Sequence, residues 1–236
     1  MNSACLRALR IGLASARANA MPMLVLWGLA VALVMAYYFV PCSSVFFAPL
    51  QKWQETYGIL AAFITKFVFC GLLPAVFLLA FKSIRIRFPI WKAAAISVWT
   101  GTWGVVYLGF YSFQCQMFGN GSDFGTLLYK TAFDEFVWAP CVVMPLSSLF
   151  FLWLGCDFSF SRTLCRCRDG FVMRVMLPNL VSNWCVWIPA VLAIYAFPLP
   201  LQVQMLGLVS SFWSLMCLQI GRRVQGECED GHDSVY

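Results

Sequence analysis

Residues 177–220 read LPNLVSNWCVWIPAVLAIYAFPLPLQVQMLGLVSSFWSLMCLQI and contain no charged side chain. A membrane-spanning helix needs only about 20 apolar residues, so this stretch is long enough for two. Pro198 and Pro200 divide it, because proline lacks a backbone N–H and its ring clashes with the preceding helical turn. The stretch therefore predicts two transmembrane helices, at about 177–197 and 202–220, joined by a short turn.

The remainder of the chain has the same apolar character. Of the 236 residues, 61% are hydrophobic and 11% are charged, whereas soluble domains carry about 25% charged residues. A chain with so few charges could not cover its surface in water. Four further apolar runs, at about 21–40, 57–81, 93–118 and 136–156, are each long enough to span a bilayer. We therefore predict an all-α protein, a polytopic transmembrane helical bundle of six spans.

This bundle has a short extension at each end. Residues 1–20 form a basic N-terminal segment, residues 21–221 a single transmembrane helical domain, and residues 222–236 a short acidic tail that we expect to be disordered. The N-terminal segment contains arginines and no acidic residue, which fits a mitochondrial presequence as well as the basic flank of a first span. The first span is too long for a typical signal-peptide core, so we expect an uncleaved anchor.

The distribution of basic residues supports six spans. Of the 16 Lys and Arg residues, six spans place thirteen on one side of the membrane and two on the other, with Lys66 inside a span. Fusing the last two spans would reduce this asymmetry to eleven against four. Basic loops remain on the cytoplasmic or matrix side, so we expect both termini there. The basic residues lie in short clusters between apolar runs, which reports topology and not a nucleic-acid-binding surface.

Polar residues within or beside the apolar runs are the candidate functional residues. Lys66 lies well inside a span, where an unpaired charge costs roughly 3 kcal/mol. Asp134 and Glu135 enter the fourth span from the side nearer to Lys66, so we predict an ion pair between Lys66 and one of them. Four amides lie near that side as well: Gln114, Gln116, Gln202 and Gln204. A polar vestibule or conduit is the functional interpretation, and snorkelling with ordinary interfacial placement is the alternative.

Two further patterns predict helix contacts. Asn179 and Asn183 are four residues apart and share a helix face, so they either bond across helices or line the inner half of a pathway. Small residues at four-residue spacing allow close approach of membrane helices, within the chain or between copies of it. Such stripes occur at Gly28–Ala32–Ala36, Ser97–Gly101 and Gly207–Ser211.

Sequence signatures of catalysis are missing. The single histidine, His232, lies in the acidic tail, and there is no Gly-x-Ser-x-Gly and no phosphate-binding Gly-x4-Gly-Lys motif. Cys165 and Cys167 form a close pair next to arginines that would favour the thiolate, so redox or metal chemistry is conceivable there. No histidine or second cysteine pair completes a metal site beside them. We therefore expect no enzymatic activity, no cofactor and no bound metal.

One stretch resembles a known family. Lys130-x3-Asp134-Glu135-x4-Pro140 is similar to the signature Lys-x3-Asp-Gln-x4-Pro of the Mpv-seventeen and peroxisomal membrane protein family, with Glu135 in place of Gln. A second block adds four matching positions: Trp187, Pro189, Pro198 and Trp213. The resemblance covers about residues 105–216 and lacks the family's Asn-Phe pair and a later arginine. It implies a small helical inner-membrane protein, since members are regarded as candidate channels for small solutes.

These observations lead to a channel-like integral membrane protein that allows passive passage of small solutes across an inner membrane. The alternative is a non-conducting membrane scaffold that binds partners, and a thiol enzyme using Cys165 and Cys167 is a distant third. The lipid bilayer is the expected partner, a second copy of the chain is another candidate, and nucleic acid is not expected. We favour a bacterial inner membrane, with a mitochondrial inner or peroxisomal membrane as the alternatives.

Overall fold

The computed structural model describes residues 20–80, 89–168 and 176–232, and single positions at 10, 13, 17, 171 and 172. The predicted all-α class is confirmed, because the described residues form helices and no strand. The helices are α2 (Ala20–Phe39), α3 (Ser44–Lys66), α4 (Leu73–Ala80), α5 (Ile90–Phe118), α6 (Phe124–Phe133), α7 (Met144–Gly155), α8 (Phe160–Arg168), α9 (Leu177–Tyr195) and α10 (Leu199–His232). A 3-10 turn, η1 (Pro41–Ser43), and two π-helical segments, η2 (Phe67–Leu72) and η3 (Asp134–Val143), connect some of them.

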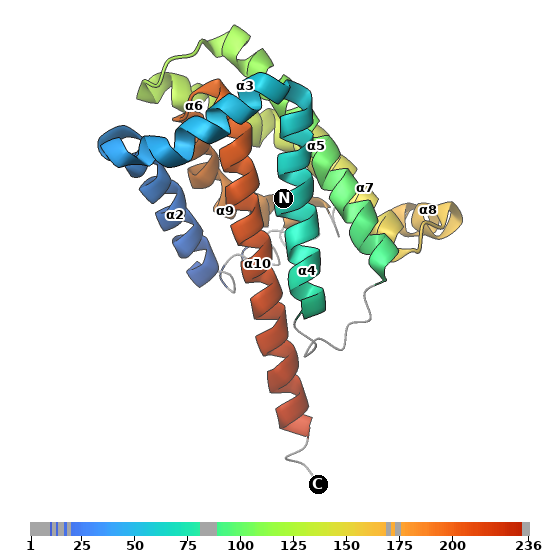
Figure 1. The fold of residues 1–236 in the computed structure, drawn as a ribbon. Helices are drawn as coiled ribbons and strands as arrows, with labels where there is room; N and C mark the ends of the chain where they lie inside the picture. Colours follow the sequence, from blue (N-terminus) through green and yellow to red (C-terminus); the bar gives the residue numbers. More distant parts are fainter. Residues whose placement is uncertain are drawn as a thin grey trace.

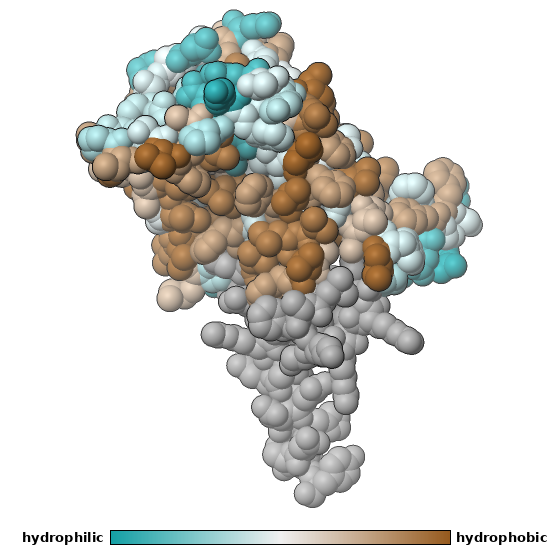
Figure 2. Space-filling view, viewed as in Figure 1, coloured by the Kyte–Doolittle hydropathy of each residue, from teal (hydrophilic) through white to brown (hydrophobic). Residues whose placement is uncertain are grey.

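Five segments of the described chain are long and apolar enough to cross a membrane. They are Ala20–Phe39, Pro41–Phe77, Ile90–Phe118, Phe124–Gly155 and Leu177–Tyr195. Their outward faces carry large apolar side chains such as Val31, Val76 and Leu146, each about half exposed. On the face shown in Figure 2, hydrophobic residues form a band below a hydrophilic end. Such a band is stable only in contact with lipid, so the protein is an integral membrane protein.

A sharp kink divides α3. Gly58 has φ 49° and ψ −114°, a conformation that glycine adopts readily because it has no Cβ. The side-chain amide of Gln54 donates to the freed Gly58 carbonyl at 2.8 Å. The residues before the kink lie across one end of the bundle, and those after it run through the bundle into η2 and α4 (Figure 1). The predicted start of the second span, at about residue 57, coincides with this kink.

The fourth predicted span begins too late. The continuous helix α6–η3–α7 starts at Phe124 and not at 136, because Asp123 caps its N-terminus through Thr126, whose backbone N–H donates to Asp123 Oδ1 at 3.0 Å. The Thr126 hydroxyl also donates to Asp123 Oδ2, at 2.7 Å, and these two hydrogen bonds hold the pKa of Asp123 below its ordinary value. The polar residues Lys130, Asp134 and Glu135 favoured a loop in the sequence, but all three are buried within the helix. Their charges therefore lie inside the bundle and not at its entrance.

The last two predicted spans are separate helices, which confirms the break near Pro198. α9 ends at Tyr195 and α10 begins at Leu199, and a tight turn joins them through Phe197 N–H to Ile194 O at 3.1 Å. The first part of α10 is the core of the bundle: Leu201, Val203, Met205, Leu206 and Val209 are all buried. Helices α2, α3, α5 and α9 surround it.

The structure describes the predicted C-terminal tail but only a few residues of the predicted N-terminal segment. α10 continues through His232, so residues 222–232 are helical where we predicted a disordered tail. The helix extends because the sequence after Ile220 contains no proline and its glycines do not interrupt the hydrogen-bond ladder. The basic segment 1–20 lies outside the described ranges, apart from Ala20 and three single positions.

Two of the three small-residue stripes lie at close helix contacts. A Cβ added to Gly101 would approach the Phe63 ring to 2.8 Å, and one added to Gly207 would approach Thr65 Cγ2 to 2.9 Å. Ser97, in the same stripe as Gly101, packs directly against Gly71 of η2. Gly28 has open space around it, so its predicted contact is absent from the described bundle.

Candidate functional site

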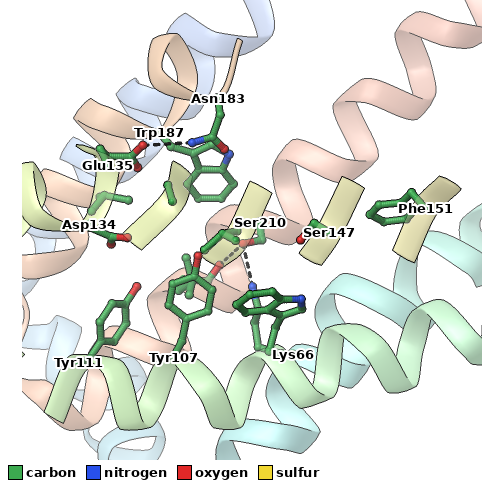
Figure 3. Close-up of a pocket in the computed structure, with 15 residues that line it drawn as sticks. Lys66, Tyr107, Tyr111, Asp134, Glu135, Ser147, Phe151, Asn183, Trp187 and Ser210 are labelled. Atoms are coloured by element: carbon green, nitrogen blue, oxygen red, sulfur yellow. Dashed lines mark hydrogen bonds between the residues drawn. The ribbon is translucent and has the colours of Figure 1, made fainter. Parts of the chain in front are cut away.

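A cavity of about 300 Å³ lies inside the bundle, between α3, α5, η3, α7, α9 and α10 (Figure 3). We call it the central cavity. Each long helix lines it with residues four apart, which lie on one helix face. The lining residues with this spacing are Trp103, Tyr107 and Tyr111 on α5, Glu135, Ala139 and Val143 on η3, Ser147 and Phe151 on α7, and Asn183, Trp187 and Val191 on α9. Lys66, Asp134, Leu206 and Ser210 complete the wall.

Lys66 ends α3 inside the bundle and is only 6% exposed. Its ammonium donates to Ser210 Oγ at 3.2 Å and lies 5.8 Å from the centre of the Tyr107 ring. Ser210 in turn donates to the Leu206 carbonyl at 2.6 Å. The lysine is thus oriented into the central cavity by a hydroxyl and an aromatic face.

The predicted direct ion pair of Lys66 with Asp134 or Glu135 is wrong. Among the described residues the ion pair found is Lys92–Asp157, and no carboxylate oxygen lies within 4.0 Å of the Lys66 ammonium. The two carboxylates lie on a different side of the central cavity from Lys66, where they bond to residues of α9 (Figure 3). The three side chains nevertheless line one cavity.

Each buried carboxylate bonds to a residue of α9. Tyr195 donates its hydroxyl to Asp134 Oδ2 at 2.7 Å, and the Asn183 amide donates to Glu135 Oε2 at 3.1 Å. The hydrogen bonds fix both carboxylates while leaving a second oxygen on each that accepts from no described residue. Asn183 therefore fulfils the predicted interhelical bond and also lines the cavity.

Pro140 explains the local structure of η3. In a π-helix the carbonyl of residue 135 would accept from the N–H of residue 140, but proline has none. The Glu135 carbonyl therefore lacks this helical partner, and it accepts from the indole N–H of Trp184 at 2.7 Å instead. The missing N–H of Pro140 thus leaves a carbonyl to which Trp184 of α9 bonds, next to Asp134 and Glu135 in the cavity wall.

Two donors that line the central cavity are unpaired. Tyr111 Oη and Trp103 Nε1 are buried and bond to no group in the described part of the chain. Leaving a buried donor without a partner costs about 1–3 kcal/mol. The cavity therefore presents free donors to whatever occupies it, water included.

Two further cavities lie in the described part of the protein. The Trp213 cavity, about 360 Å³, shares Ser147, Phe151, Asn183 and Trp187 with the central cavity and extends toward Asn179 and Trp213. The Pro198 cavity, about 400 Å³, lies where residues 120–122 meet the α9–α10 turn. It shares no lining residue with the central cavity, but Tyr195 in its wall donates to Asp134 in the wall of the central cavity.

The remaining predicted polar residues divide among these cavities. Gln202 lines the Pro198 cavity and donates to the Phe197 carbonyl at 2.9 Å, and Asn179 lines the Trp213 cavity. Gln114 is fully buried and donates to the Lys130 carbonyl at 3.2 Å. Gln116 is exposed on α5 and lines none of these three cavities.

The residues that resemble the family motif surround the site. Lys130 lies beside Cys115 Sγ at 3.5 Å and lines the Pro198 cavity. Trp187 and Trp213 line cavities, Pro198 ends the α9–α10 turn, and Pro189 lies within α9. Comparison with protein-family models, with curated proteins and with solved structures finds no match. Among the described residues, no group of three or more His, Cys, Asp or Glu side chains could hold a metal ion.

Several site residues were missed in the sequence. The sequence did not single out Tyr107, Tyr111 and Ser210, which line the central cavity. It also missed Gln54, whose side-chain oxygen accepts from the Gln204 amide at 2.7 Å, while the Gln204 oxygen accepts from the Thr65 hydroxyl at 2.7 Å. The available signal was the four-residue spacing of aromatic and small polar side chains on α5 and α9, which marks one helix face. Spacing alone does not show whether such a face points to lipid or into the bundle.

Proposed function

We propose that this protein is a channel-like membrane protein, distantly related to the Mpv-seventeen and peroxisomal membrane protein family, that allows small polar solutes to cross an inner membrane without catalysis or a cofactor. The observation that carries the proposal is the presence of three cavities whose walls are connected. The Trp213 and central cavities share four lining residues, and the Tyr195–Asp134 bond joins the wall of the Pro198 cavity to that of the central cavity.

The helix ends support a six-span arrangement with α10 as the sixth span. In Figure 1 the start of α2, the end of α4, helix α8 and the C-terminal part of α10 lie toward one end of the bundle. The first half of α3, the start of α6 and the α9–α10 turn lie at the other end. The first end carries Lys92 and the three arginines of α8, so it is the cytoplasmic or matrix side of our proposal.

The Tyr195–Asp134 hydrogen bond is the closed barrier in this proposal. Tyr195 is buried and its ring contacts the Tyr111 ring, with 5.3 Å between centroids. Breaking one hydrogen bond and rotating one aromatic side chain would join two cavities. Solute passage would then need only a side-chain motion in a fixed helical frame.

Flux in proteoliposomes tests the proposal. Purified protein should accelerate osmotic swelling in glycerol or urea relative to empty liposomes, and Tyr195→Phe should raise the rate further. Ser147→Trp, which fills the wall shared by two cavities, should reduce the rate at least about tenfold, by steric exclusion. Leu149→Trp, on the half-exposed outer face of α7, is the matched control and should keep the rate. Wild type and Tyr195→Phe both indistinguishable from empty liposomes would refute conduction.

A non-conducting scaffold is the second candidate, and one observation favours it. Gly28 and Ala32 of α2 are exposed, and Gly28 has nothing within 4 Å of an added Cβ. A small-residue stripe on an outward face is typical of membrane helices that associate with another helix. If this face binds a second copy, Gly28→Leu should convert a dimer to a monomer in detergent, measured by light scattering, without changing solute flux.

A further inference from the structure

The central cavity holds one basic and two acidic side chains that do not touch. Lys66 and Ser210 lie on one side, and Asp134 and Glu135 lie on another, with Tyr107 between them in the view of Figure 3. The ammonium has no carboxylate oxygen of the described residues within 4.0 Å. Opposite charges enclosed in one polar cavity normally pair directly, because isolation of each is costly. Here each charge faces the cavity from its own side.

Both sides have unused hydrogen-bonding capacity. The Lys66 ammonium has three N–H donors and uses one of them, on Ser210. Asp134 and Glu135 each use one carboxylate oxygen, on Tyr195 and Asn183. The cavity therefore presents free donors near Lys66 and free acceptors near the two carboxylates.

The unpaired neutral donors extend this arrangement. The indole N–H of Trp103, in the wall of the cavity, is buried and bonds to no described group. Tyr111 contacts the ring of Tyr195, which bonds to Asp134, so its hydroxyl belongs to the carboxylate side. Both side chains are more than nine-tenths buried and line the cavity.

We propose that the central cavity binds a small zwitterion, a molecule that carries a carboxylate and an ammonium group, of the α- or β-amino acid type. This inference rests on the proposed function, because it names the class of solute that the cavity accepts. The solute carboxylate accepts from the Lys66 ammonium. Its ammonium donates to Asp134 and Glu135, and the Tyr107 ring offers a cation–π surface beside them.

Other solute classes match only part of this wall. A simple anion would pair with Lys66 but meet two carboxylates, and a simple cation would pair with the carboxylates but meet the lysine. An uncharged solute would leave all three charges without a partner of opposite sign. The volume of about 300 Å³ is at the lower limit of small-molecule pockets, so the zwitterion must be small.

Binding to the purified full-length protein in detergent tests this inference. Glycine, β-alanine, acetate and ethylammonium would each be titrated into the protein at constant ionic strength. Binding would be measured by calorimetry and by tryptophan fluorescence, since Trp103 and Trp187 lie in the cavity wall. We expect glycine or β-alanine to bind at least about tenfold more tightly than acetate and ethylammonium, since only the zwitterion engages both sides. Equal affinity for all four probes, or no binding of any, would overturn the inference even without a variant.

Charge-neutral variants assign the two sides. Lys66→Met should abolish the preference for glycine over ethylammonium, and Glu135→Gln should abolish the preference for glycine over acetate. Lys92→Met and Glu55→Gln make the same changes outside the cavity, at a surface ion pair and at an exposed helix face, and should keep both preferences. Variants at Lys66 and Glu135 that retain wild-type selectivity would overturn the assignment.

The binding and flux experiments can fail separately. Selective zwitterion binding without flux of any solute would remove the channel function and leave the binding site. Flux of glycerol and urea without zwitterion binding would retain the channel and overturn the inference.

Discussion

Helix α5 has two faces, one of which packs closely against neighbouring helices while the other lines the central cavity. Toward η2 and α3 it presents Ser97, Gly101 and Gly104, and Gly104 packs directly against the Ala62 carbonyl. Toward the central cavity it presents Trp103, Tyr107 and Tyr111. The small residues of the first face allow close van der Waals contact with the neighbouring helices. The large side chains of the second face lie between helices that are separated by the central cavity. Close helix packing is therefore concentrated in one face, and the side chains that line the candidate site lie on the other.

The largest expected effect comes from the tight face. Gly104→Ala places a Cβ against the Ala62 backbone carbonyl, which no rotamer change can relieve. Overpacking of this kind costs about 1–3 kcal/mol, so we expect a markedly lower melting temperature in detergent. Gly28→Ala, where the added Cβ meets open space, is the matched control and should not lower it. Equal melting temperatures for the two variants would show that the faces of α5 do not differ in packing.

The next effect concerns the wall of the cavity. Trp184→Phe removes the donor to the Glu135 carbonyl and leaves that carbonyl unpaired, at about 1–3 kcal/mol. Pro140→Ala restores a backbone N–H that can donate to this carbonyl in the π-helical register. The double variant should therefore melt at a higher temperature than Trp184→Phe alone. Additive losses would indicate that Pro140 does not govern this bond.

A smaller effect is expected at Lys66. Lys66→Met loses one hydrogen bond, to Ser210, but also removes the cost of burying an ammonium without a carboxylate partner. The two contributions oppose each other, so the melting temperature should change less than in Gly104→Ala. A loss as large as that of Gly104→Ala would mean that the lysine holds the bundle together and is not reserved for a solute.

The smallest effect lies at the end of the bundle, where Lys92 pairs with Asp157 at 2.6 Å. The Lys92 ammonium, by hydrogen bond and by charge, holds the pKa of Asp157 below its ordinary value. A lowered folded-state pKa stabilises the fold above the unfolded pKa, and this stabilisation is lost as pH falls through the folded value. Asp157→Asn, which tolerates the positive φ of 54°, should slightly lower the melting temperature at pH 7 and leave it unchanged at pH 2. An equal difference at both pH values would exclude the ion pair as its cause.

Local features of the sequence determined the helical class, the apolar spans and the break at Pro198. Each is a property of one segment: the length of an apolar run decides whether it can cross a membrane, and proline interrupts a helix wherever it occurs. The residues of the candidate site could also be found in part, because charges and amides in apolar runs stand out. Lys66, Asp134, Glu135 and Asn183 were identified in this way and do line one cavity.

Tertiary structure alone decided which of these residues meet. The ion pair expected for Lys66 is absent among the described residues, and Asp134 and Glu135 bond to Tyr195 and Asn183 of α9 instead. Which partner a buried charge meets depends on how the helices pack, and spacing along one segment does not give this. The kink at Gly58 and the cavity formed by Tyr107, Tyr111 and Ser210 depend on contacts between distant segments. Hydropathy and spacing are the same for a face turned to lipid and a face turned to a cavity, so only the packed bundle distinguishes them.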